Sequence, residues 1–146
     1  MKLNTLVLLF SCFLFSGIHA QETLIFHGSH EPKKADAPYS DVVEAGNLLF
    51  LAGQIGMDHD TRTLVDGGIQ AQTRQAIENI KEVLDQHDMG LDRVVKATVI
   101  LADINDFAAF NEVYTEYFTN KPARTTFAAA GLAAGAAIEI EVIAVK

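Results

Sequence analysis

Residues 68–101 read GIQAQTRQAIENIKEVLDQHDMGLDRVVKATVIL, and their hydrophobic periodicity changes once, near Gly90. Before that point, apolar residues recur at helical spacing with charged residues between them. This pattern predicts an amphipathic helix over residues 68–89, with Gly90 as its C-terminal cap. After it, residues 94–101 are nearly all apolar and β-branched, which is typical of a central strand covered on both faces.

A hairpin is predicted on the N-terminal side of this helix. Residues 41–45 and 48–52 flank Gly46-Asn47, a two-residue turn in which both positions tolerate positive φ. The glycine-punctuated residues 53–58 are expected to continue the second strand past a bulge.

An earlier short strand is predicted at residues 23–27. The loop that follows contains Pro32 and Pro38, which would interrupt a strand, and it reaches Tyr39. Because loops often carry function, Tyr39 is a candidate site residue.

A second helix and two strands follow residue 101. The helix is expected to begin near Asp103, which can cap it, and one stripe of it carries Phe107, Phe110, Tyr114 and Phe118. Residues 124–128 and 138–145 are the two remaining strand candidates.

The resulting order is β-β-β-α-β-α-β-β, an α+β fold. Two helices about 10 Å wide cover only one face of a sheet whose strands lie about 4.8 Å apart. Yet Ile143 and Val145 alternate with Ile140 and Val142, so the second face is partly apolar too. An uncovered apolar face implies burial in an oligomer.

The N-terminus has the layout of a secretory signal. Lys2 precedes an apolar run over residues 6–15, and Ala20 supplies a small residue before a cleavage site. The run is shorter than the roughly 20 residues of a membrane helix. We therefore expect residues 1–20 to be a signal peptide and residues 21–146 to form one exported domain, periplasmic or secreted, with no membrane segment. The single cysteine, Cys12, lies in the signal, so no disulfide is expected.

Composition and motif content argue against several functions. The formal net charge of −8 argues against a nucleic-acid partner, which requires a positive stripe. The histidines at 27, 30, 59 and 87 show no paired-ligand spacing, so no metal site is expected. No phosphate-binding glycine loop or nucleophilic triad is evident either.

Arg124 and Glu139 are the strongest candidates for a role in catalysis or substrate binding. Arg124 follows Pro122 at the start of a strand, and a guanidinium on a stiff element suits bidentate capture of a carboxylate; an inter-subunit salt bridge is the alternative. Glu139 points away from the core on the last strand. There it is either solvated or, if that face lies at an interface, able to orient water. Asn111 shares the aromatic stripe, and a buried amide there could brace a loop.

The chain from about Tyr39 to Lys146 resembles the Rid family, also called YjgF proteins. The resemblance rests on Ala37-Pro38-Tyr39-Ser40, Gly53-Gln54-Ile55, Asn79-Ile80, Asn105-Asp106-Phe107-Ala108, Asn111, Pro122-Ala123-Arg124 and residues 138–145. It implies a homotrimer with a chorismate-mutase-like β-barrel core and sites between subunits.

The resemblance also implies a reaction and residue roles. Such proteins resemble hydrolases that convert 2-imino acids and their enamine tautomers to 2-keto acids and ammonia without a cofactor or metal. By position, Arg124 would bind the substrate carboxylate and Glu139 the hydrolytic water. Tyr39, Gly53 and Asn111 would line the pocket, and Thr126 could donate a hydrogen bond.

Two departures from the family pattern leave alternatives open. Ala52 stands where many members have Ser or Thr, and Thr126 where many have Cys or Ser. A module that binds small carboxylates, or acts as a holdase, without turnover is therefore the main alternative. Ribonuclease activity is a third, which the acidic charge disfavours.

Overall fold

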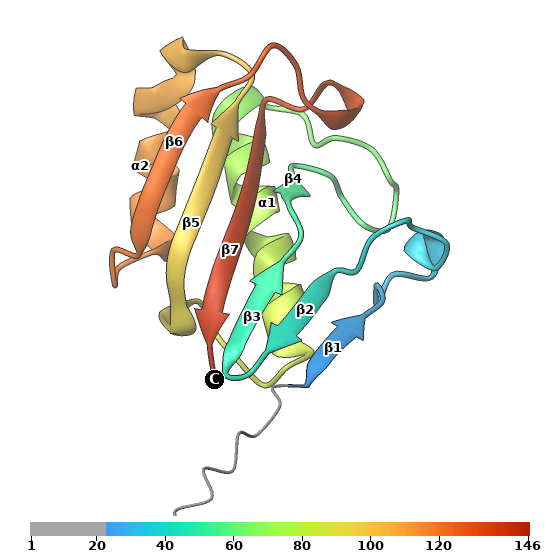
Figure 1. Ribbon diagram of the computed structural model, residues 1–146. Helices are drawn as coiled ribbons and strands as arrows, with labels where there is room; N and C mark the ends of the chain where they lie inside the picture. Colours follow the sequence, from blue (N-terminus) through green and yellow to red (C-terminus); the bar gives the residue numbers. More distant parts are fainter. Residues whose placement is uncertain (1–22) are drawn as a thin grey trace, which may run out of the picture.

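The computed structural model describes residues 23–146, and the predicted signal peptide, residues 1–20, lies outside them. Within the described residues, a seven-stranded mixed sheet carries two α-helices on one face (Figure 1). The strand order is β1-β2-β3-β7-β5-β6, and β4 pairs with β7 beyond the end of β3. The strands are Leu24–His27 (β1), Val42–Ala45 (β2), Leu48–Leu51 (β3), Gln54–Ile55 (β4), Val94–Leu101 (β5), Ala123–Ala128 (β6) and Ile138–Val145 (β7). The helices are Gly68–Asp85 (α1) and Phe107–Tyr117 (α2).

The predicted α+β order of strands and helices is confirmed, with β4 as a separate short strand. The barrel core expected from three chains concerns an assembly and stays a prediction. Among the helices of residues 23–146, none combines the length and apolar character needed to cross a bilayer.

The hydrophobic core lies between the sheet and the two helices. On β7, Ile138, Ile140, Val142 and Ala144 are buried, whereas the alternate residues point to the opposite face. Buried residues of α1, such as Ile77, Ile80 and Leu84, pack in the same cluster. The alternation predicted for the last strand is confirmed, and it places Glu139 outside the core.

The opposite face of the sheet is left uncovered within the chain. The strand registers bring Leu24, Phe26, Phe50 and Phe127 to this face, where they are 41–66% exposed. The prediction that β5 is covered on both faces is therefore wrong for a single chain. β5 is central, between β7 and β6, but the helices cover only one side of it.

A bulge separates β3 from β4, as the glycines of residues 53–58 predicted. Phe50 pairs with Ile143 and Gln54 pairs with Ile140, so one strand advances four residues while its partner advances three. The extra residue lets the chain bend where Gly53 passes β7. This bend opens the site described below.

The end of α1 differs from the prediction. The helix stops at Asp85, and Gly90 has an extended backbone with φ of −115°. Asp88 instead adopts the left-handed conformation, with φ of 55°. The amide of Met89 donates to the carbonyl of Leu84, and that of Asp88 to Asp85, which is a Schellman-type cap. Aspartate tolerates this conformation because its short side chain can bond locally, so glycine was not required.

Candidate functional site

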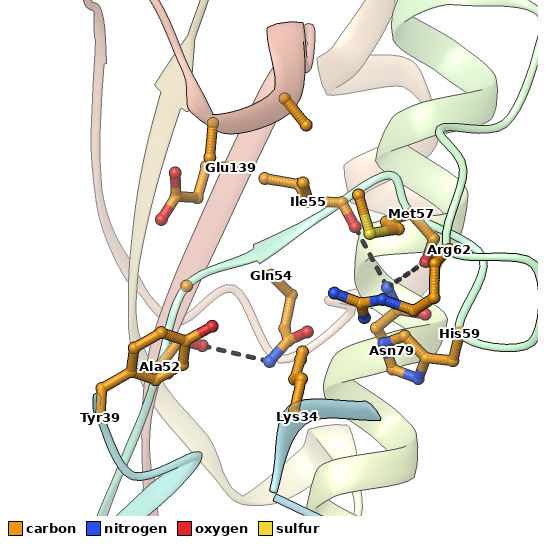
Figure 2. A pocket seen from close by; sticks show the side chains of 13 residues that line it. Lys34, Tyr39, Ala52, Gln54, Ile55, Met57, His59, Arg62, Asn79 and Glu139 are labelled. Carbon is orange, nitrogen blue, oxygen red and sulfur yellow. Dashed lines mark hydrogen bonds between the residues drawn. The ribbon is translucent and has the colours of Figure 1, made fainter. Parts of the chain in front are cut away.

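A pocket of about 470 Å³ opens where β4 passes β7, beside α1 and the loop before β2. In Figure 2, Glu139 and Tyr39 lie at one end of it, whereas His59, Arg62 and Asn79 lie at the other. It is lined by Lys34, Tyr39, Ala52, Gly53, Gln54, Ile55, Met57, His59, Arg62, Asn79, Ala133, Ala134 and Glu139. The pocket therefore brings together Tyr39, Gly53 and Glu139, three of the predicted site residues. We call these three the glutamate half-site.

The position of Glu139 depends on the absence of a side chain at Gly53. A Cβ atom on Gly53 would overlap Oε1 of Glu139 and stand 2.9 Å from its Cδ and 3.0 Å from its Cγ. The pairing of Ile55 with Glu139 holds the two strands at this spacing. Gly53 thus fits the pocket because it makes room for the carboxylate, a geometric reason that the family resemblance did not supply.

Asn79 supports the pocket from α1 and was not among the predicted site residues. It is 1% exposed, and its amide nitrogen donates to the carbonyls of Ile55 (3.1 Å) and Met57 (2.9 Å). Gln75 donates to its amide oxygen. The sequence contained a signal for this role, because Asn79 is a polar residue on the apolar side of an amphipathic helix.

An ion-pair network forms the far wall of the pocket. Glu31 is 6% exposed and contacts Lys34 (2.5 Å), Arg62 (2.7 Å) and His59 (3.3 Å). Burial alone would raise the pKa of Glu31, but the hydrogen bond from Lys34 and the charges of Lys34, His59 and Arg62 outweigh it and lower the pKa. Sequence reasoning missed this wall because its members come from two separate loops.

Arg124 lies elsewhere, on the inner face of β6 against α2. Its guanidinium donates to the amide oxygen of Asn111 at 2.9 Å. Its central carbon lies 4.6 Å from the ring centre of Tyr114, 5.0 Å from that of Phe110 and 5.7 Å from that of Phe107. Asn111 was predicted to brace a loop, but it braces the arginine instead. The aromatic stripe both packs in the core and holds a cation.

Two hydroxyl groups beside Arg124 are buried. Burial raises the pKa of Tyr114, and the nearby charge of Arg124 offsets part of this rise. The Arg124 guanidinium lies over the Tyr114 ring, and neither the Tyr114 hydroxyl nor that of Thr126 has a hydrogen-bond partner within residues 23–146. Thr126 follows Arg124 on the same strand face. We call Asn111, Arg124 and Thr126 the arginine half-site.

The fold keeps the two half-sites apart within one chain. Arg124 pairs with Ala97, which is fully buried on the helix side of the sheet. Glu139 pairs with Ile100 on the other face. Neither Arg124 nor Glu139 forms an ion pair with another residue of the described chain. Both charged groups therefore remain available for a ligand or for a second chain.

Four histidines form two groups with glutamates, although their spacing in the sequence indicated no such grouping. His27 and His87 meet at Glu44, and His30 and His59 meet at Glu82. The members of each group come from segments far apart in the sequence, so ligand spacing could not have identified them.

Comparisons with known proteins show which family the chain belongs to. The family model described as Endoribonuclease L-PSP matches residues 28–146. A RutC family protein of Pyrococcus horikoshii is 50% identical over 114 residues, which are 77% of this chain and 90% of that protein. A human protein named 2-iminobutanoate/2-iminopropanoate deaminase is 43% identical over 113 residues, 77% of this chain and 82% of that protein.

A solved structure is also similar over the whole of its own length. A Rid family protein of Yersinia pestis, described as of unknown function, matches with a TM-score of 0.78 and 36% identity, covering 85% of this chain and 100% of that one. The match of the family model and the identity to these relatives lead to one conclusion: the chain belongs to the Rid (YjgF, L-PSP) family.

Proposed function

We propose that this protein hydrolyses 2-imino acids to 2-keto acids and ammonia, at a site that two copies of the chain build together within a homotrimer. The observation that carries this proposal is the placement of Arg124 and Glu139 on opposite faces of one sheet. A guanidinium and a carboxylate that act on one substrate then have to come from different chains.

The uncovered sheet face supports association of several copies. Phe26, Phe50 and Phe127 are exposed on it, together with Leu24, and Glu139 lies on the same face. Large apolar patches of this kind mark protein interfaces. Burying this face against a neighbouring chain would also enclose the glutamate half-site and exclude bulk water from it.

The arginine half-site suits a carboxylate. Arg124 uses one donor on Asn111 and keeps the others free for a bidentate contact. Three aromatic rings surround the guanidinium and limit its movement. The Thr126 hydroxyl is buried next to it without a partner in residues 23–146, so it could complete its hydrogen bonding on a bound ligand.

The glutamate half-site suits activation of water. Glu139 would accept a proton from water as the oxygen attacks the imine carbon, and would pass this proton to the nitrogen, which gives a carbinolamine. The hydroxyl proton of the carbinolamine would then move to the nitrogen as the carbon–nitrogen bond breaks, which leaves a carbonyl group and ammonia and consumes one water. The carbon of the imine is already electrophilic, so orienting the reactants and transferring protons suffice for catalysis. The proton transfer would accelerate the reaction by about 10²–10⁴-fold.

Mixing two inactive variants tests the shared site directly. Arg124→Ala and Glu139→Ala each leave every site of a homo-oligomer incomplete. When equal amounts are refolded together, about one quarter of the sites draw an intact arginine and an intact glutamate from different chains. We expect recovery of about that fraction of wild-type activity, measured as ammonia released from imines that an amino-acid oxidase generates.

The matched control replaces Glu139→Ala in the mixture with the double variant. A mixture of Arg124→Ala with Arg124→Ala/Glu139→Ala contains no intact arginine, so activity should stay at background. Recovery no greater than the sum of the two separate variants would refute the shared site. Wild-type protein that accelerates hydrolysis of none of several imino acids would refute the deaminase.

The main alternative is a protein that binds small carboxylates without turnover. Ala52, which offers the pocket no hydroxyl, is the residue that favours it. It predicts saturable binding of 2-keto acids with no ammonia released. The family description names an endoribonuclease, but the net charge of −8 disfavours an RNA substrate.

We further propose that the protein works outside the cytoplasm after removal of residues 1–20. The imine would then come from a source such as amino-acid oxidation. Fractionation of the source cells, with N-terminal sequencing of the mature chain, tests this. A cytoplasmic protein that retains Met1 would contradict it.

A further inference from the structure

A second cavity, of about 180 Å³, lies between β1, the start of β2 and the C-terminal end of α1. It shares no lining residue with the pocket that holds Glu139. Three imidazoles, those of His27, His30 and His87, face it together with Asp41. The proposed deaminase reaction uses none of these residues.

Asp41 is the first sign that this cavity holds a cation. It is only 3% exposed, and neither carboxylate oxygen has a hydrogen-bond partner within residues 23–146. A buried carboxylate is normally hydrogen-bonded, paired with a cation or bound to a metal, because an unpaired charge is strongly disfavoured away from water. The wall of the cavity therefore lacks a positive charge.

The group formed by His27, Glu44 and His87 is the second, independent sign, because two of its members, His27 and His87, line this cavity. Nε2 of His27 lies 3.0 Å from Oε1 of Glu44, and Nδ1 of His87 lies 3.7 Å from the same oxygen. The three ligand atoms all lie within 4.8 Å of one another. With metal–ligand bonds of about 2.0–2.1 Å, the edge of a tetrahedral zinc site measures about 3.3 Å, so these separations need only small adjustments.

The three residues are held in place by separate elements. His27 ends β1, Glu44 lies in β2, and His87 belongs to the turn that caps α1. Glu44 is 8% exposed, and the side chain of His87 is 12% exposed.

We propose that His27, Glu44 and His87 bind a divalent transition-metal ion, Zn²⁺, with Asp41 compensating its charge from the cavity wall. Imidazole nitrogen and carboxylate oxygen are ligands that zinc accepts, and three protein ligands leave one position open. Lys146 contacts the other carboxylate oxygen of Glu44, so Oε1 stays available. The net charge of −8 further favours a cation.

The second histidine group fits a metal less well. Glu82 is half exposed there, and His59 lies between Glu82 and Glu31. Both ring nitrogens of His59 already contact carboxylates, Nδ1 that of Glu82 and Nε2 that of Glu31. It provides a matched control, since it has the same ligand types at another place on the chain.

The test measures zinc binding to the full-length protein, purified without a histidine tag and treated with chelator. Competition with a colorimetric zinc indicator should show one tight site per chain. His27→Gln and Glu44→Gln should each weaken binding at least about 100-fold, since even residues that only support a ligand contribute 10–100-fold. Asp41→Asn should weaken it at least about 10-fold, and His59→Gln should leave it unchanged.

Two further readouts separate ligand loss from misfolding. Co²⁺ should give the visible absorption of a tetrahedral site in the wild type and in His59→Gln, but not in His27→Gln, whose circular dichroism should match the wild type. His27 is the most exposed of the three ligands, so this variant is expected to fold. Wild-type protein without a stoichiometric zinc site, or equal binding by His27→Gln, would overturn the assignment. Unchanged affinity in Asp41→Asn would overturn the role given to Asp41.

Discussion

Replacing Gly53 with alanine provides the sharpest test of how Glu139 is positioned. Gly53 is not in the left-handed region, so alanine fits its backbone without strain. The new Cβ, however, would overlap Oε1 of Glu139 and stand 2.9 Å from Cδ. Because unbonded carbon atoms lie best at about 3.5–4.0 Å, the carboxyl group must retreat by roughly 1 Å.

This displacement should act on catalysis far more than on stability. The carboxyl group is at the end of a flexible side chain and can rotate away, so we expect the free energy of unfolding to change by less than about 1 kcal/mol. A 1 Å misplacement of a catalytic group can cost about 100-fold in rate, equivalent to about 2.7 kcal/mol of transition-state stabilisation. We therefore expect kcat for imine hydrolysis to fall about 100-fold in Gly53→Ala.

A double-mutant cycle shows whether Gly53 acts through Glu139. If it does, Gly53→Ala should have little further effect on kcat in a Glu139→Ala background. Urea unfolding of all four proteins provides the stability control. Wild-type activity in Gly53→Ala, or an equal loss in both backgrounds, would refute the reasoning.

Three further predictions follow from the described contacts. Asn111→Ala removes the acceptor that orients Arg124 and should lower kcat/KM about 10-fold; steady-state kinetics showing no change would contradict the bracing role. Glu31→Gln should destabilise the protein by about 2 kcal/mol at neutral pH. Because the folded pKa of Glu31 is lowered, its contribution is present above the ordinary value of 4.5 and should disappear as the pH falls below it, which urea unfolding across pH can check. Phe50→Lys, on the uncovered sheet face, should leave circular dichroism unchanged but reduce the particle mass in sedimentation; an unchanged mass would place the interface elsewhere.

The fold was largely predictable because its information is local. The alternation of residues 138–145 placed Glu139 outside the core, and the glycines of residues 53–58 indicated the bulge. The end of α1 was predicted wrongly because aspartate as well as glycine can take the left-handed conformation. Asp88 takes it before the chain reaches Gly90. Residue preferences alone do not rank such neighbouring candidates.

The site was less predictable because its contacts depend on strand register. In the aromatic stripe, Phe110, Tyr114 and Phe118 are buried in the core but Phe107 is exposed, and the contact of the stripe with Arg124 requires β6 to pair with β5 at Ala97. The meeting of His27 with His87 likewise joins β1 to the end of α1, sixty residues away. Spacing rules detect ligands that share one element, and these do not.

The separation of the two half-sites has a consequence for how activity depends on protein concentration. Each chain presents its arginine half-site on one face of the sheet and its glutamate half-site on the other, so contacts between chains would run head to tail. Every half-site then finds a partner only if the chains close into a ring. Upon dilution below the dissociation constant of the ring, specific activity should then decline, although each monomer keeps its fold.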